Sequence, residues 1–181
     1  MLFSRLSLVL TLLIFGSVTA APVPDAYTYS TLILRAPMTP AHKAAAVQVL
    51  KQVKNKLRPQ PNQAVFWSGT TTKDGKLTSI RHDAGDYAKA NGKETIHQAL
   101  EKNNIKIPGP RNNPASTRLW DAASKIWAFR SKGETNAILG DRRPGNVYDN
   151  IEKPRLIKNP DVNKIVEHDK NKGTSSTVHQ K

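Results

Sequence analysis

Residues 64–69 read Ala-Val-Phe-Trp-Ser-Gly, an apolar run that ends in a small polar turn. A short apolar run bounded by turn residues is typical of a strand that is buried on both faces. We therefore predict a buried strand over residues 64–68. Trp67 and Ser68 come at its end, next to the exposed backbone N–H groups of the turn.

Helical patterns surround this strand. Thr39 and Pro40 suit the N-cap and the first position of a helix, and Thr95 with Gln98 fits a capping box. Apolar spacing, caps and β-prone composition together predict helices over residues 40–57, 82–91, 96–103, 117–130 and 159–167, and strands over residues 27–34, 134–139 and 147–151. Residues 69–75 are predicted to be turn. Helices mixed with short strands indicate an α/β or α+β fold.

The two ends of the chain differ from its middle. Arg5, the apolar run 6–15 and the small residues 18–20 have the layout of a secretory signal peptide, which we predict over residues 1–20. Residues 21–61 then hold a strand and an amphipathic helix, in one domain with a core over 62–168. The polar, basic residues 169–181 are predicted to be a disordered tail. The expected location is extracellular, with delivery into host cells as a further route.

Charge and cysteine content restrict the partners. The chain carries a net charge of +14, or +13 once Arg5 is removed with residues 1–20, and it has no cysteine. Thiol catalysis and cysteine-ligated zinc are therefore excluded. The five histidines show no paired ligand spacing, so no metal site is expected. The positive charge favours an anionic partner, which includes small phosphorylated molecules and nucleic acid.

Two tryptophans stand close to serines. Trp67 precedes Ser68 at the end of the buried strand, where an indole and free backbone N–H groups would suit a stacked ring and a phosphate. Trp120 and Ser124 are one helical turn apart and share a face, so they could line a pocket. The alternative in both places is a core tryptophan next to an ordinary turn or helix.

Two charged features follow the last predicted strands. Glu152 comes directly after the predicted strand 147–151, where a carboxylate could project into a cleft and stabilise an oxocarbenium ion; the alternative is a solvated loop acid. Arg142 and Arg143 form a basic turn that could clamp phosphate, or simply be solvated.

Taken in order, five segments resemble the ADP-ribosyl cyclase / NAD glycohydrolase family. They read AVFWSG, TIHQAL, LWDAASKIWAF, TNAILG and VYDNIEKPRLIKNPDV, and they lie within residues 62–168. In that family a Phe-Trp-Ser, a helix start, a Trp-x-x-x-Ser, a strand ending in Gly and a catalytic Glu follow one another. The chain also resembles, in general character, small secreted effector-type proteins.

The resemblance implies both fold and site. The fold would have a helical lobe and a lobe with a small, mainly parallel sheet. Glu152 would be the catalytic acid. The substrate-binding residues would be Trp67 and Trp120 at the nicotinamide end, Ser68 and Ser124 on the phosphate and ribose side, and Tyr148 near the diphosphate.

Two positions differ from the family pattern. His97 stands where the family has a second acid, so it would act as a donor, and Gly69 stands where an arginine often follows Phe-Trp-Ser, a role that Arg142 or Arg143 could take. The resemblance implies an NAD-cleaving enzyme that uses NAD as substrate and needs no separate cofactor. Two alternatives remain: a non-catalytic effector that binds an anionic ligand or a host protein, and a nucleic-acid-binding protein.

Overall fold

The structure is a computed structural model that describes residues 40–108 and 114–181. The predicted signal peptide and the predicted strand over residues 27–34 lie outside the described residues. The helices are α2 (Pro40–Lys56), α3 (Arg81–Ala90), α4 (Ile96–Lys102), α5 (Pro114–Arg130), the π-helix η1 (Tyr148–Glu152) and α6 (Lys153–Lys158). The strands are β1 (Ala64–Ser68), β2 (Thr70–Lys73), β3 (Lys76–Ser79), β4 (Glu94–Thr95), β5 (Gly133–Leu139), β6 (Val162–Asp169) and β7 (Thr174–Gln180).

A five-stranded sheet organises the fold, in the order β4-β1-β5-β6-β7. All neighbours are parallel except β6 and β7. The run Ala64–Ser68 is therefore a buried strand near the middle of the sheet, as predicted. The expected fold class, helices with a small and mainly parallel sheet, is confirmed.

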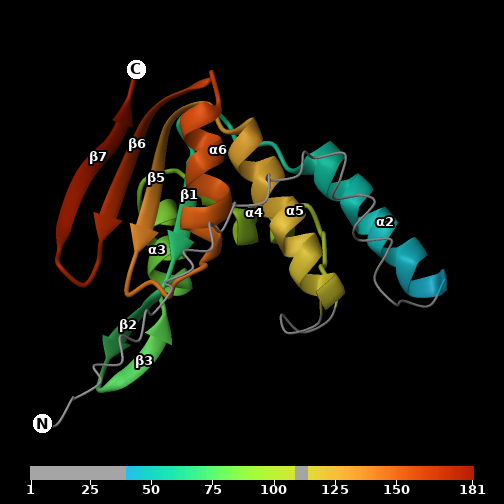
Figure 1. Cartoon of the computed structure of the whole chain (residues 1–181), viewed down its shortest axis with the longest axis horizontal. Coiled ribbons are helices and arrows are strands. Elements are labelled where there is room, and N and C mark those ends of the chain that lie inside the picture. The colour runs from blue at the N-terminus through green and yellow to red at the C-terminus, as the bar shows by residue number, and fades with distance from the viewer. Residues whose placement is uncertain (1–39, 109–113) are drawn as a thin grey trace, which may run out of the picture.

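Helices cover both faces of the sheet (Figure 1). On one face, Val65 and Ile138 pack against α3 through Ala84 and Ala88. On the other face, Phe66 belongs to the largest core cluster, whose other buried members include Leu100 of α4, Ala123 and Trp127 of α5, and Leu156 of α6. The helix α2 packs outside α5 through Ala46, Leu119 and Ala122. The alternation along β1 thus turns successive side chains toward different helices.

The loops after β1 and β5 are held against each other. Gly140 donates its N–H to the carbonyl of Ser68, and Asp141 and Thr70 exchange two backbone hydrogen bonds of 2.8 and 3.1 Å. A Cβ atom at Gly140 would collide with the backbone carbonyl of Thr70. Gly69 has a φ of +103°, and its Cβ would come within 2.7 Å of the Asp141 oxygen. Only glycine allows this close approach.

The structure corrects the prediction of turn over residues 69–75. A hairpin of β2 and β3 projects there from the end of the sheet (Figure 1). Asp74 and Gly75 form its two-residue turn with positive φ angles of 50° and 71°. Asp-Gly is a strong hairpin signal in such a position, so the sequence did contain this information.

The predicted helix over residues 159–167 is wrong, because these residues lead into β6. Val162 and Ile165 are both fully buried, and their spacing of three suggested a helix. A bulge at Asn163 lets both side chains face the core, since Val162 pairs with Gly133 whereas Lys164 pairs with Glu134. The predicted disordered tail is also wrong, because Thr174–Gln180 pairs with β6 as β7.

The predicted strand over residues 147–151 is wrong as well. Asn146 accepts a hydrogen bond of 3.0 Å from the backbone N–H of Asp149 and so caps a helical turn. The turn continues as η1, in which the N–H of Lys153 donates to the carbonyl of Tyr148, five residues earlier. π-helical turns of this kind are frequent at functional sites.

Candidate active site

The candidate site lies between β1 and β5, the point in the sheet at which the order of the strands reverses. After β1 the chain passes through α3 to β4 on one side, whereas after β5 it passes through η1 and α6 to β6 on the other side. Neighbouring parallel strands whose connections leave in opposite directions create a crevice at their carboxyl ends, and ligands bind there in open α/β folds. The loops after β1 and β5 form this crevice.

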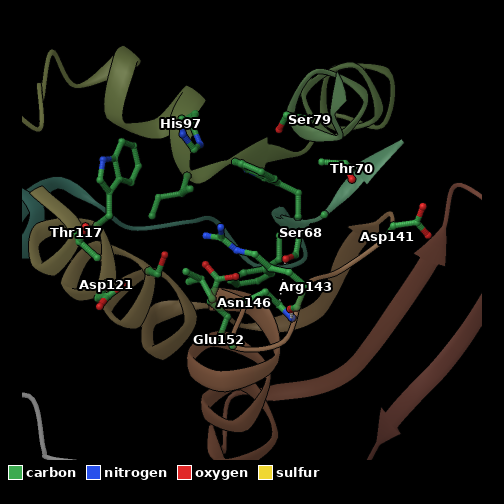
Figure 2. Close-up of a pocket in the computed structure, with 18 of the residues that line it drawn as sticks. Ser68, Thr70, Ser79, His97, Thr117, Asp121, Asp141, Arg143, Asn146 and Glu152 are labelled. Atoms are coloured by element: carbon green, nitrogen blue, oxygen red, sulfur yellow. Dashed lines mark hydrogen bonds between the residues drawn. The ribbon is translucent and has the colours of Figure 1, made fainter. Parts of the chain in front are cut away.

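A cavity of about 540 Å³ occupies this crevice. Its lining comes from the loops after β1 and β5, the hairpin, the start of α4, one face of α5 and the end of η1 (Figure 2). The polar and aromatic side chains that line it include Trp67, Ser68, Thr70, Ser79, His97, Thr117, Trp120, Asp121, Ser124, Asp141, Arg143, Asn146 and Glu152. Two exposed apolar side chains, Leu77 of β3 and Val147 before η1, lie at the same cavity.

Glu152 is the buried acid of the cavity, with 5% of its surface exposed. Burial raises its pKa to about 8; the hydrogen bond with Ser124 lowers the pKa, and the nearby Asp121 raises it further. The carboxyl is therefore mostly protonated at neutral pH when the cavity holds no ligand. A positive charge placed beside it would favour the ionised form.

Asp121 is a second acid on α5, one residue after Trp120. Burial raises its pKa, and the ammonium group of Lys125, one turn further along the helix, opposes this effect. Burial lowers the pKa of Lys125 to about 8, and Arg155 lowers it too. Asp121 and Glu152 thus form an acidic wall of the cavity.

Three aromatic rings form the opposite wall. The imidazole of His97 is stacked on the indole of Trp120, with ring centroids 4.7 Å apart and planes 25° apart. The same imidazole contacts the indole of Trp67, with centroids 5.4 Å apart and planes tilted by 46°. His97 thereby bridges the two tryptophans, and Figure 2 shows it across the cavity from Glu152.

A hydrogen-bonded group fixes the loop after β5. The hydroxyl of Ser68 donates to Oδ1 of Asn146 at 3.0 Å. The amide of Asn146 donates to Asp149 at 2.7 Å, and Arg142 donates to the same carboxylate at 2.7 Å. Arg142 is therefore engaged, whereas Arg143 extends toward the cavity (Figure 2). Of the two arginines, Arg143 is the one placed to meet a ligand.

The structure brings seven of the eight predicted site residues to one cavity: Trp67, Ser68, His97, Trp120, Ser124, Arg143 and Glu152. Tyr148 is not among them. Its side chain is fully buried, and its hydroxyl donates to Glu167 at 3.0 Å. Burial and Glu167 raise the pKa of Tyr148, so it is a neutral core residue. The expectation that Tyr148 contacts a diphosphate therefore does not fit its position.

Sequence reasoning missed six polar residues of the cavity: Asn146, Asp121 and Asp141, and the hydroxyl residues Thr70, Ser79 and Thr117. The sequence signal for Asn146 was its position three residues before Asp149, at the start of a helical turn. Asp121 was visible within the Trp120–Ser124 segment but was not singled out. Asp141 offers no signal, because only the pairing of its loop with Thr70 brings it to the cavity.

Two features are absent from the described residues. No group of three or more His, Cys, Asp or Glu side chains is arranged to hold a metal ion there. Within the same part of the chain, no helix combines the length and the apolar character that a membrane crossing requires.

Comparison with known proteins gives matches to solved structures alone. No family model and no curated protein matches the chain. The crystal structure of Aplysia cyclase complexed with the substrate NGD and the product cGDPR is similar over 81% of this chain and 76% of that chain, with 17% identity and a TM-score of 0.44. A structure described as addressing the catalytic mechanism of CD38 is similar over 77% and 70%, with 16% identity and a TM-score of 0.44.

An ADP-ribosyl cyclase complexed with N1-cIDPR matches over the same 81% and 76%, with 15% identity and a TM-score of 0.44. At these identities and TM-scores, the likenesses say nothing about the activity of this chain.

Proposed function

We propose that this protein cleaves the bond between nicotinamide and ribose in NAD, with water as the acceptor. One observation carries the proposal: the buried carboxyl of Glu152 faces a cavity whose opposite wall is built from Trp67, His97 and Trp120. Four of the five ordered segments that resemble the NAD glycohydrolase family contribute lining residues to this cavity, and the fifth, TNAILG, forms the neighbouring strand β5.

The charges around the cavity support a ligand with a cationic ring. Although the chain carries +14, three acids line the cavity, namely Asp121, Asp141 and Glu152, against one arginine, Arg143. Even with Glu152 mostly protonated, Asp121 and Asp141 outnumber Arg143, so a purely anionic ligand would meet more negative than positive side chains. NAD suits this arrangement because its pyridinium ring is positive and its diphosphate is negative. The cationic end belongs near Glu152 and the indoles, and the diphosphate near Arg143.

The chemistry requires a fixed negative charge near the anomeric carbon. As the C–N bond breaks, its electron pair leaves with nicotinamide, which becomes neutral, and positive charge develops on the ribose. Ionised Glu152 would stabilise that charge. Water then forms the new C–O bond at the anomeric carbon and releases one proton to solvent. The pyridinium of the bound substrate favours ionisation of Glu152, whose pKa is about 8 in the empty cavity.

Nicotinamide release from NAD tests the proposal. The Glu152→Gln variant keeps the size of the side chain and an acceptor for Ser124 but has no charge, so kcat should fall by at least a hundredfold with a small change in KM. The matched control is Asp141→Asn, which changes an exposed acid of the same cavity. It should keep kcat within a few fold.

Equal turnover by Glu152→Gln and the parent would refute the role of Glu152. Absence of turnover by the parent would refute the enzyme and favour a non-catalytic effector that binds its ligand in the same cavity.

A further inference from the structure

A second hollow adjoins the cavity. It has a volume of about 300 Å³, and its lining includes Arg81 at the start of α3, Leu100 and Glu101 of α4, and Ile105, Lys106 and Ile107 after α4. His97 and Trp120 line both this hollow and the cavity. The stacked pair of imidazole and indole is therefore the partition between the two spaces.

The imidazole of His97 contacts both indoles of the aromatic wall, at centroid distances of 4.7 and 5.4 Å. These are the distances at which a bound aromatic ring stacks on a tryptophan. A planar ring that is to contact Trp67 and Trp120 together must therefore take the place that the imidazole already fills. The indoles cannot both receive a ligand while His97 stays where it is.

The position of His97 at the start of its helix allows the imidazole to move away from the two indoles. It is the second residue of α4, which begins at Ile96. Inside a helix, one of the three side-chain rotamers is blocked by the preceding turn, but no turn precedes the first one. Rotation about the Cα–Cβ bond can therefore carry the imidazole away from the indoles. The hollow beyond the partition is large enough to receive a ring of that size.

We infer that His97 is an internal stand-in for the substrate ring: its imidazole fills the site between Trp67 and Trp120 in the empty protein, and a planar cationic ring displaces it toward the second hollow. The inference rests on the proposed function only in naming the ring as a pyridinium. His97 is thereby a positioning residue that sets the affinity for the ring. It closes the aromatic site to weakly stacking molecules and opens it to a ring that stacks more strongly.

Binding of 1-methylnicotinamide tests this inference without turnover. This probe is a permanently cationic pyridinium that carries no ribose and no phosphate. We expect His97→Ala to bind it about tenfold more tightly than the parent, equal to about 1.4 kcal/mol, because no ring has to be displaced. His97→Phe should bind it more weakly than the parent, since an apolar phenyl ring is harder to displace into the second hollow, whose lining includes Arg81, Glu101 and Lys106. Calorimetry gives the dissociation constants, and tryptophan fluorescence reports the occupied site.

The matched control is His82→Ala, which removes an exposed histidine of α3 that lines neither space. It should bind like the parent. Equal or weaker binding by His97→Ala, or no binding by any variant, would overturn the inference.

Nuclear magnetic resonance of the parent gives a second readout that needs no variant in the site. The ring currents of two indoles should shift the imidazole C–H signals of His97 upfield, and saturation with the probe should return them toward ordinary values. Unchanged signals at saturation would overturn the inference. A parent that releases no nicotinamide but shows this shift would refute the proposed function and leave the inference standing.

Discussion

Replacement of the buried acid by its amide should stabilise the protein while it removes activity. The pKa of Glu152 rises from 4.5 to about 8 on folding, mainly through burial. When folding raises the pKa of a carboxyl, the free energy of unfolding falls as the pH rises from the pKa of the unfolded state to the pKa of the folded state. The parent therefore carries a penalty that is near zero at pH 4 and grows to roughly 3 kcal/mol at pH 7 and roughly 5 kcal/mol at pH 9.

Glu152→Gln removes this penalty, because an amide does not ionise. Its melting temperature should match that of the parent at pH 4 and exceed it by roughly 6–12 °C at pH 7, with a larger difference at pH 9. Near-ultraviolet circular dichroism at the three pH values measures the difference. The control is Glu101→Gln, which changes an exposed acid of α4 and should show no such trend. A difference between Glu152→Gln and the parent that stays constant from pH 4 to pH 9 would refute burial as the cause of the raised pKa.

Three further outcomes are expected. The value of kcat/KM should rise with pH up to about 8 and then level off, because it reports the free enzyme, in which Glu152 must ionise; a profile that falls between pH 6 and 8 would contradict this. Arg143→Gln should raise the KM for NAD by about tenfold, whereas Arg142→Gln, whose guanidinium binds Asp149, should act mainly on melting temperature; steady-state kinetics of both variants decide. Gly140→Ala should lower stability by several kcal/mol, as measured by urea unfolding, because the new Cβ meets the backbone of Thr70; wild-type stability would show that the two loops can separate.

The parts of the fold that follow one periodicity could be predicted from the sequence. The buried strand Ala64–Ser68, the capping box of Thr95 and Gln98, and the helix that ends at Arg130 all appear where local patterns indicate them. The wrong predictions of secondary structure lie where one local pattern of apolar residues fits two kinds of element. Val162 and Ile165 suit a helix or a bulged strand equally well, and only pairing with β5 decides between them.

The residues of the candidate site that could be predicted are those whose side chains suggested a role in the sequence itself, such as the tryptophans and Glu152. Seven of the predicted residues meet at the cavity because they fall at the end of β1, in the loop after β5, at the start of α4, on one face of α5 and at the end of η1. The role of Tyr148 near a diphosphate was implied by the family resemblance alone, and the π-helical turn instead directs its side chain into the core, where it donates to Glu167. The contact of His97 with both indoles depends on the distance between α4, α5 and β1, which no single segment of sequence encodes.

The last strand of the sheet, β7, determines what happens when residues after β6 are removed. β7 satisfies the outer backbone groups of β6, and after it the N–H of Lys181 donates to Asn163 and its ammonium group donates to the carbonyl of Asn159. A chain cut after residue 170 would leave β6 as a bare edge, with Val166 and its neighbours open to pairing with another molecule. Solubility of this protein therefore depends on residues 171–181, although none of them lines the cavity.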